Sequence, residues 1–375
     1  MKSDEILRSV SRRDFLRKGS TGVATALFTP GILSCAGMGN RENKKLGIAL
    51  VGIGYYSRSV LAPCLQHTQY ARLAGIVTGS AAEDREFIEK YGIDEKNIYT
   101  YDDFDRVADN PDIDIIYVVL PNGMHREYTI RAARAGKHVI CEKPMAANAQ
   151  ECREMIAACK NAGVQLSIGY RMHFEPYTQE IMRLARDKDF GEIHLVSAGA
   201  GYRHTDYDHW KTKKALAGGA MMDMGVYSLQ AARYSTGEEP VSVSAQTFKT
   251  RPEHFEADEI TTFQLQFPSG TVANCETGFH ASFNYLKVYC EKGWYELEPF
   301  SAYNGIKGRS SAGEFQFPDI NQQVAQMDEV ALCIQEGRPM RVPGEEGLKD
   351  MILVDAVYES IASGGSTIPI PEFRG

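Results

Sequence analysis

The feature that most restricts the fold is a regular alternation of apolar runs and helically spaced apolar residues between residues 46 and 162. The apolar runs predict strands at 46–51, 71–78, 113–120 and 138–141. Helical spacing follows these runs around residues 60–65, 87–88, 125–135 and 149–162. Because strands and helices that alternate with short connections form a parallel sheet covered on both faces, residues 44–170 are predicted to form a doubly wound α/β domain.

A glycine-rich turn joins the first predicted strand to its helix, with the sequence Gly52-Ile53-Gly54-Tyr55-Tyr56-Ser57. In a dinucleotide fingerprint the first glycine, here Gly52, permits a tight turn, and the second, Gly54, lets a pyrophosphate approach the backbone. The helix start at Tyr55, Tyr56 and Ser57 offers unpaired N–H groups to such an anion. Ser57 stands where the fingerprint usually has Gly or Ala, and a plain turn is the alternative. The strand–turn–helix context favours a nucleotide site.

The end of the second predicted strand indicates which nucleotide is bound. An NAD site usually has an acid there for the adenosine ribose, but this chain continues Thr78-Gly79-Ser80, with Arg85 soon after. The sequence therefore predicts NADP, with Ser80 donating a hydrogen bond to the 2′-phosphate and Arg85 supplying positive charge. The alternative is that Glu83 or Asp84 turns back and serves NAD.

The pattern changes after Tyr170. Short runs, several alternating apolar with polar residues, predict strands at 193–198, 241–248, 260–267, 271–277 and 285–290, as expected for a sheet with one packed face. Helical spacing at 324–335 and 348–361 predicts two helices that pack back on the body. Since 375 residues exceed what one hydrophobic core usually supports, we expect two domains, each with its own core.

Residues 1–40 have the order of an export signal, with basic residues before a short apolar run. Ser11-Arg12-Arg13-Asp14-Phe15-Leu16 has the paired arginines of a twin-arginine signal. Ile32-Leu33-Ser34-Cys35 resembles a lipobox that would anchor the mature chain to a membrane through Cys35, and ordinary cleavage after Ala36 is the alternative. We therefore expect a periplasmic protein. A basic tail or a surface helix is the other interpretation of this segment.

Composition and charge exclude several classes of protein. Charged residues at 24% and hydrophobic residues at 43% are typical of a soluble globular chain, and a net charge of −8 argues against nucleic-acid binding. No close-spaced Cys/His pattern indicates zinc, and no disulfide framework is expected. The polar stretch His204-Thr205-Asp206-Tyr207-Asp208-His209 is interpreted as a loop or a sugar-contacting lid, because helical spacing of metal ligands is missing. No metal is predicted.

Two motifs carry a resemblance to a known family, Pro121-Asn122-Gly123-Met124-His125 and Ala135-Gly136-Lys137-His138-Val139-Ile140-Cys141-Glu142-Lys143-Pro144. Further matching stretches are 168–171, 216–227 and 342–347. From about residue 46 to residue 370 the chain resembles the Gfo/Idh/MocA oxidoreductases, and among them the glucose–fructose oxidoreductase branch. The resemblance implies a Rossmann domain at 44–170 and an open, mostly antiparallel sheet at 171–375 that carries the sugar site. It also implies a tightly held nicotinamide cofactor and a homo-oligomer, either a dimer or a tetramer.

The resemblance also assigns roles to residues in these motifs. It places Pro121, Asn122, His125, Glu142 and Lys143 at the cofactor. For His125, a purely structural place at a helix start is the alternative.

Arg171 follows a strand end, where ligand contacts concentrate in α/β sheets, so it is predicted to bind substrate. A structural salt bridge is the alternative for this arginine.

Lys143, Asp223 and Tyr227 are the predicted catalytic residues. Removing hydride from a sugar carbinol requires a group that takes the hydroxyl proton, and a tyrosine does this at neutral pH only if a cation favours its ionised form. By the resemblance, Lys143 lies beside the nicotinamide, and Asp223 and Tyr227 face the substrate. Asp223 precedes Tyr227 by four positions, on the same helical face. Gln230 replaces a residue that is commonly acidic in the family. Each of the three could instead be structural.

Export and redox chemistry together suggest a mechanism. A cofactor carried out of the cytoplasm inside a folded protein must be reduced and re-oxidised in one site. We therefore predict that an aldose is oxidised to a lactone and a second sugar reduced, by ping-pong hydride transfer. The alternatives are a redox-assisted glycoside hydrolase of the same fold, a conventional sugar or inositol dehydrogenase, and a non-catalytic nucleotide or sugar sensor.

Overall fold

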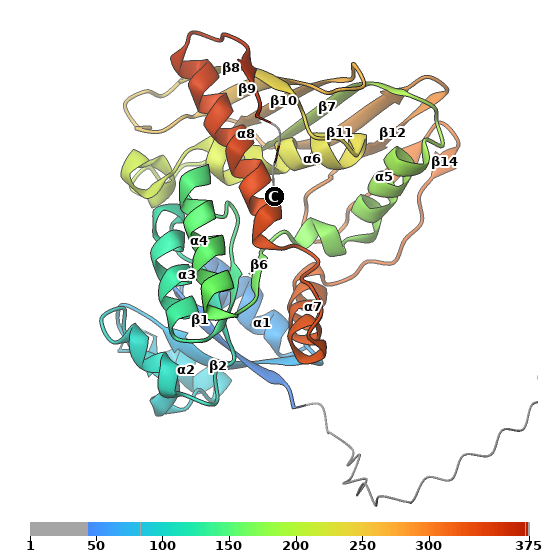
Figure 1. Cartoon of the computed structure of the whole chain (residues 1–375). Coiled ribbons are helices and arrows are strands. Elements are labelled where there is room, and N and C mark those ends of the chain that lie inside the picture. Colours follow the sequence, from blue (N-terminus) through green and yellow to red (C-terminus); the bar gives the residue numbers. More distant parts are fainter. Residues whose placement is uncertain (1–43, 83, 372, 374–375) are drawn as a thin grey trace, which may run out of the picture. The chain divides into compact units, whose positions relative to one another are not determined.

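The structure is a computed structural model that describes residues 44–82, 84–371 and 373. These described residues form one unit (Figure 1). The predicted twin-arginine signal and the lipobox with Cys35 lie outside the described residues. Among the residues that are described, no helix has the length and apolar character needed to cross a membrane.

The first sheet has six parallel strands in the order β3-β2-β1-β4-β5-β6. Its strands are β1 (Leu46–Val51), β2 (Ala71–Val77), β3 (Ile98–Tyr99), β4 (Ile115–Val118), β5 (His138–Cys141) and β6 (Leu166–Ile168). The order reverses between β1 and β4, and this switch point is where doubly wound sheets bind nucleotides. The predicted α/β domain is confirmed, with the two short strands β3 and β6 added.

Helices cover both faces of this sheet: α1 (Ala62–Leu65), α2 (Arg85–Tyr91), α3 (His125–Arg134), α4 (Ala149–Ala162), α7 (Gln322–Glu336) and α8 (Gly344–Ala362). Strand β1 illustrates why, because Ile48 and Leu50 pack with α1 and α7, whereas Ala49 and Val51 belong to the opposite core. A strand buried on both faces must be apolar throughout. The predicted helices at 324–335 and 348–361 thus pack back on the body, and α7 completes the first domain from the far end of the chain.

The second sheet has nine strands in the order β14-β13-β12-β11-β7-β10-β9-β8-β15. They are β7 (Ile193–Gly201), β8 (Ser242–Phe248), β9 (Ile260–Gln266), β10 (Val272–Gly278), β11 (Phe283–Cys290), β12 (Gly293–Leu297), β13 (Gly308–Ser310), β14 (Gly313–Glu314) and β15 (Ile368–Pro369). Only β7 and β10 pair in parallel, so the predicted mostly antiparallel sheet is confirmed.

Two further helices belong to this half, α5 (Pro176–Asp187) and α6 (Val226–Thr236). Every residue of α6 is buried, and it packs on β7 and β10. Short helical turns connect the elements, at Ser57–Leu61, Glu95–Asn97, Phe104–Asp109, Asn122–Met124, Arg171–Phe174, Trp210–Thr212, Lys214–Leu216 and Met221–Gly225.

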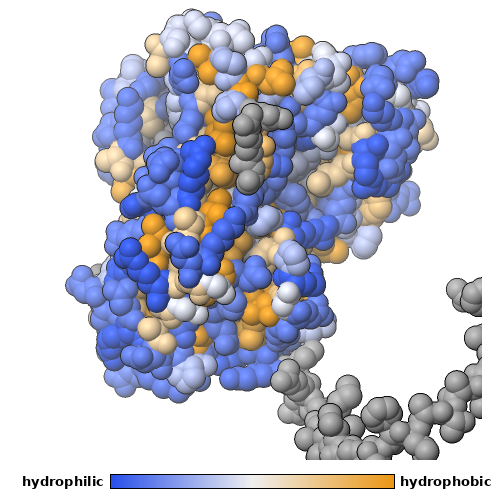
Figure 2. All heavy atoms as spheres, in the orientation of Figure 1, coloured by the Kyte–Doolittle hydropathy of each residue, from blue (hydrophilic) through white to orange (hydrophobic). Residues whose placement is uncertain are grey.

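The two sheets share one hydrophobic cluster, and the first sheet has a second cluster of its own on its other face. The largest hydrophobic cluster runs from Val51 and Cys141 in the first sheet to Val196 and Leu286 in the second. The end of β6 is tied to the segment before α8, where the N–H of Ile168 donates to the carbonyl of Val342 at 3.0 Å. The two sheets are therefore parts of one body. On the face seen in Figure 2, hydrophobic residues lie as patches between hydrophilic ones. The seven described cysteines are free, and Cys152 and Cys159 are buried, as predicted.

Candidate active site

The predicted glycine turn lies at the carboxyl end of β1. Gly52 has a φ of +92°, and a Cβ there would be 2.5 Å from the carbonyl oxygen of Val119. Only glycine fits this conformation without strain. The buried hydroxyl of Ser57 donates to the carbonyl of Gly52 at 2.6 Å. Ser57 is therefore the third small residue of the fingerprint, and its hydroxyl ties the start of the helix to the turn.

The space in front of Gly54 is open, since a Cβ built there meets no atom within 4 Å. Tyr55 begins the following helical segment and its side chain is 75% exposed, while Tyr56 lies 6.0 Å from Tyr303, centroid to centroid. An open approach to a helix start whose N–H groups lack helical partners fits a bound pyrophosphate. The residues present therefore fit a dinucleotide.

The end of β2 differs from the prediction, because a carboxylate does lie there. Asp84 is buried, accepts a hydrogen bond from the Thr78 hydroxyl, and forms an ion pair with Arg58. Its place just before α2 turns it back toward the strand end. Ser80 is half-buried, and Arg85 is exposed at the start of α2. The negative charge that Asp84 brings to this corner is thus matched by Arg58, a residue that the sequence did not single out.

His125 bridges two loops at the carboxyl ends of β4 and β5. One ring nitrogen lies 2.8 Å from the carbonyl oxygen of Leu120 and the other 2.9 Å from that of Pro144. The ring is buried, and burial lowers its pKa. Both nitrogens are occupied by the backbone, so the ring holds the loop that contains Pro121 against the loop that contains Lys143.

Asn122 and Glu142 are also buried, and each forms a hydrogen bond with another part of the chain. The Asn122 amide donates to the carbonyl of Ala217 at 2.8 Å, which joins the first domain to the segment before the predicted Asp223–Tyr227 helix. Glu142 accepts a hydrogen bond of 2.7 Å from the Tyr117 hydroxyl, and burial raises its pKa. These contacts fix the loop on which Lys143 stands.

The structure brings the three predicted catalytic residues together. The Lys143 ammonium donates to the main-chain carbonyl of Asp223 at 2.7 Å and lies 3.5 Å from its Oδ1 atom. The same ammonium lies 4.7 Å from the centroid of the Tyr227 ring. A cation this close to an aromatic face is attracted to it.

Asp223 stands in the helical turn Met221–Gly225, which leads into α6. This turn is anchored by Asp258, whose carboxylate accepts a hydrogen bond of 2.7 Å from the N–H of Met221. The π-helical turn and α6 continue without a break. Asp223 and Tyr227 are thus held on consecutive turns, as their spacing predicts.

Two residues that the sequence did not suggest complete the surroundings of Asp223. Its Oδ2 atom accepts hydrogen bonds from the Lys211 ammonium at 2.7 Å and from the Tyr202 hydroxyl at 2.9 Å. Burial alone would raise the pKa of Asp223, but Lys211 and then Lys143 more than offset it and hold this pKa well below its usual range. Burial, followed by the charge of Asp223, raises the pKa of Tyr202. Asp223 is therefore a carboxylate between two ammonium groups.

Arg171, predicted to bind substrate, is buried and turned toward the backbone. It donates to the carbonyls of Ser301 and Ala302, the latter at 3.0 Å. Its guanidinium carbon lies 5.3 Å from the Tyr227 ring centroid and 4.6 Å from that of Tyr303. Arg171 thus forms no salt bridge with a described residue and separates two aromatic rings. The guanidinium thus packs against Tyr227 on one side and against Tyr303, which is 43% exposed, on the other.

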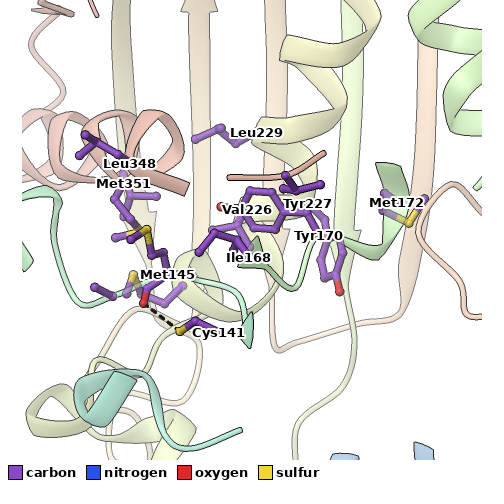
Figure 3. Packing of buried hydrophobic residues seen from close by; sticks show 14 of the residues in the cluster. Cys141, Met145, Ile168, Tyr170, Met172, Val226, Tyr227, Leu229, Leu348 and Met351 are labelled. Atoms are coloured by element: carbon purple, nitrogen blue, oxygen red, sulfur yellow. Dashed lines mark hydrogen bonds between the residues drawn. The ribbon is translucent and has the colours of Figure 1, made fainter. Parts of the chain in front are cut away.

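The Tyr227 ring is packed on its inner side. It belongs to the same cluster as Ile168, Tyr170 and Met172, which Figure 3 shows near it, together with Val226. Only 9% of Tyr227 is exposed. A ring that is packed this way keeps one orientation, so its hydroxyl has a fixed place relative to Lys143.

The polar stretch 204–209 lies next to Tyr202 and Lys211, the two residues that bind Asp223. Among the described residues no cluster has the composition of a metal site. His204 packs among Tyr202, Phe255 and Phe279, and His209 accepts a hydrogen bond of 3.3 Å from the N–H of Lys211. Burial lowers the pKa of both histidines. The stretch therefore supports the turn that carries Lys211.

Comparison with known families decides the assignment. A model of an oxidoreductase family with an NAD-binding Rossmann fold matches residues 46–170, and a model of the GFO/IDH/MocA C-terminal domain matches residues 178–296. The chain belongs to the Gfo/Idh/MocA oxidoreductase family. The resemblance seen in the sequence is confirmed, and this family consists of NAD(P)-dependent oxidoreductases.

Several family members are similar over most of their length. Aldose-aldose oxidoreductase from Caulobacter crescentus is 42% identical, with 87% of this chain and 100% of that chain covered and a TM-score of 0.84. An NADP(+) D-xylose 1-dehydrogenase from Haloarcula marismortui is 27% identical, with 83% of this chain and 90% of that protein covered. D-glucoside 3-dehydrogenase from Escherichia coli is 25% identical, with 85% and 96% covered. These three relatives are named for reactions on sugars or glycosides.

Proposed function

We propose that this protein oxidises an aldose at C1 to a lactone and passes the electrons to a second sugar, through an NADP cofactor that stays bound. The observation that carries the proposal is the meeting of Lys143, Asp223 and Tyr227, in a domain whose first strand ends in an open glycine turn. The 42% identity to an aldose-aldose oxidoreductase supports C1 of an aldose as the reacting position and a second aldose as one acceptor. An open-chain ketose is the other acceptor considered.

When bound, the nicotinamide supplies an acceptor for a hydride and later a donor. The protein contributes the proton transfer. Tyr227 accepts the proton of the C1 hydroxyl as the C1–H bond breaks, and returns a proton when the carbonyl of the second sugar is reduced. The ammonium of Lys143 lies 4.7 Å from the centroid of the Tyr227 ring and is proposed to favour the phenolate, which is the form that accepts the proton. Asp223 anchors that ammonium and accepts a hydrogen bond from a sugar hydroxyl.

Binding of NADP rather than NAD rests on the corner at the end of β2. Ser80 and Arg85 are proposed to bind the 2′-phosphate. Because Arg58 pairs with Asp84, the carboxylate at this corner is offset instead of repelling a phosphate. Release of NAD in place of NADP from the denatured protein would contradict this assignment.

Retention of the cofactor is linked to export. The proposed twin-arginine route carries folded proteins, and a periplasmic enzyme cannot draw on cytoplasmic nucleotide. The cellular location is checked by fractionating cells that express the whole chain and a variant with Arg12 and Arg13 changed to lysine. The homo-oligomer stays a prediction that light scattering of the purified protein checks.

The activity is tested with purified protein, glucose and a second sugar, without added nucleotide. The proposal predicts a lactone and the matching polyol in equal amounts, over many turnovers per protein molecule. A need for stoichiometric added NADP would instead favour the conventional dehydrogenase, a reaction named for the xylose relative. Release of sugar from a nitrophenyl glycoside would favour the hydrolase.

Tyr227→Phe provides the residue-level control. The change removes only the hydroxyl and leaves the packed ring and its contact with Lys143 in place. Turnover should fall by about a hundredfold or more, the range assigned to general acid–base catalysis, while bound nucleotide is retained. Turnover within a factor of two of the wild type would exclude Tyr227 as the proton-transfer residue.

A further inference from the structure

Lys211 is the residue near Asp223 to which neither the sequence pattern nor the proposed mechanism gives a role. Its ammonium donates to Asp223 Oδ2 at 2.7 Å and to the Tyr202 hydroxyl at 3.1 Å. The Lys211 side chain is 25% exposed and that of Asp223 11% exposed. A pair removed this far from water interacts more strongly than a surface ion pair.

The backbone holds Lys211 firmly in this place. It lies in the turn Trp210–Thr212, where the buried Thr212 hydroxyl donates to the carbonyls of Tyr207 and His209 at 2.9 and 3.0 Å. The carbonyl of Lys211 accepts a hydrogen bond of 2.8 Å from the N–H of Gly219, just before the turn that carries Asp223. The backbone of Lys211 is therefore fixed by hydrogen bonds, and its side chain extends from a defined position to Asp223.

The two lysines take different atoms of Asp223. Lys143 takes the main-chain carbonyl and lies nearest to Oδ1, whereas Lys211 and Tyr202 take Oδ2. With Oδ2 bound, the carboxylate has one rotation, and Oδ1 faces Lys143.

We propose that Lys211 is a positioning residue of the active site, which orients Asp223 so that Asp223 in turn holds Lys143 over Tyr227. The inference rests on the proposed sugar oxidoreductase activity and adds a second cation to it. Loss of Lys211 leaves Oδ2 with the Tyr202 hydroxyl alone. The carboxylate then loses the charge that fixes its rotation, and Lys143 keeps its bond to the main-chain carbonyl of Asp223 but no longer has Oδ1 held toward it. The effect is therefore expected in turnover more than in sugar binding.

A positioning role can be told from a simple structural ion pair by the pH profile. The titratable and charged groups that interact with Asp223 are Lys143, Tyr202, His204, His209, Lys211 and Tyr303, and Tyr227 lies against Lys143. Of these, Lys211 is the largest influence that lowers the pKa of Asp223. Without it, the pKa of Asp223 rises, and activity is lost at a higher pH on the acid side.

The experiment compares Lys211→Met, Lys211→Arg and Lys214→Met in the full chain. Lys214 is an exposed lysine three positions along the same loop and serves as the matched control. For Lys211→Met we expect kcat to fall about tenfold or more, KM to change by less than about threefold, and the acid limb of kcat/KM to move upward in pH. Lys211→Arg should move the acid limb back toward the wild-type position, and Lys214→Met should match the wild type.

The outcomes separate the two proposals. If the wild type forms no lactone from any aldose, the proposed function fails. If the wild type is active and Lys211→Met keeps the wild-type kcat and acid limb, the role of Lys211 is overturned. The role is also overturned if folded Lys211→Arg has its acid limb of kcat/KM at the same pH as Lys211→Met. Melting temperature and bound nucleotide are measured for each variant, and Lys211→Gln replaces Lys211→Met if the latter yields no folded protein.

Discussion

The two glycines of the nucleotide turn should respond in opposite ways to the same substitution. Gly52 has a φ of +92°, and its Cβ would meet the backbone carbonyl of Val119 at 2.5 Å and Leu120 at 2.8 Å. A left-handed conformation costs a non-glycine residue about 1–2 kcal/mol, and the contact with a backbone oxygen adds to this. Gly52→Ala should therefore destabilise the fold by about 2–4 kcal/mol, the range of a strained backbone position plus a forced shift.

Gly54→Ala adds the same methyl group where nothing lies within 4 Å. The fold should keep its stability or gain up to about 1 kcal/mol, because alanine loses less conformational entropy than glycine. The methyl group would instead occupy the space through which a pyrophosphate approaches the backbone. Gly54→Ala should therefore lose nucleotide while it remains folded.

The assay measures unfolding in urea and bound nucleotide for both variants, with protein stripped of nucleotide used for the stability comparison. Stripping matters because a bound ligand stabilises the folded state by itself. We expect Gly52→Ala to have a lower urea midpoint, and Gly54→Ala to have the wild-type midpoint with at least about tenfold weaker nucleotide binding. The reasoning is refuted if Gly54→Ala unfolds as early as Gly52→Ala, or if it binds nucleotide as tightly as the wild type.

Two further predictions concern buried carboxyl groups. Burial raises the pKa of Asp350 to about 6 although Arg233 lies beside it, so the stability it contributes is fully present below about pH 4 and is lost as the pH rises through 6. Between pH 4 and pH 7 the wild type should lose about 3 kcal/mol more stability than Asp350→Asn, as measured by urea unfolding, and a constant difference would contradict this. Asp223 is the opposite case, because its pKa is held low against the effect of burial by Lys211 and Lys143, and its ionised form stabilises the fold above about pH 4. Asp223→Asn should lower the melting temperature at pH 7 and reduce turnover at least about tenfold. The difference in melting temperature between this variant and the wild type should narrow below pH 4. Equal melting temperatures of the two proteins at pH 7 would refute the charge argument.

Much of the fold could be predicted from local patterns. The helix predicted at 149–162 from helical spacing has the bounds of α4, whose ends are formed by a side-chain cap at Asn148 and a left-handed Gly163. Strands β3 and β6 were missed because they have two and three residues, too few for a pattern. The hydrophobic cluster that the two sheets share could not be predicted for another reason: periodicity shows which face of a strand is buried but not which distant segment covers it.

The same limit applies to the candidate site. Asp223 and Tyr227 could be paired because helical geometry relates residues four apart, and Lys143 because its motif resembles that of a known family. Arg58 could not be predicted in either way, although it lies just after the glycine turn, in the first predicted helix. Its partner Asp84 is 26 positions further on (84 − 58), and only the parallel pairing of β1 with β2 brings the two together. A sequence pattern holds no signal for such an ion pair.

Lys211 shows what would have been needed to predict the remaining contact. It is 12 positions before Asp223 (223 − 211), in a turn without any helical or strand periodicity. The chain between them folds back because two adjacent glycines allow close approach: a Cβ at Gly218 would be 2.4 Å from the carbonyl oxygen of Lys211, and one at Gly219 would be 2.1 Å from Asp258. Gly219 also has a φ of +120°. The two glycines are therefore the one sign of this contact in the sequence. They indicate that the chain makes a close approach there, but not which side chains that approach brings together.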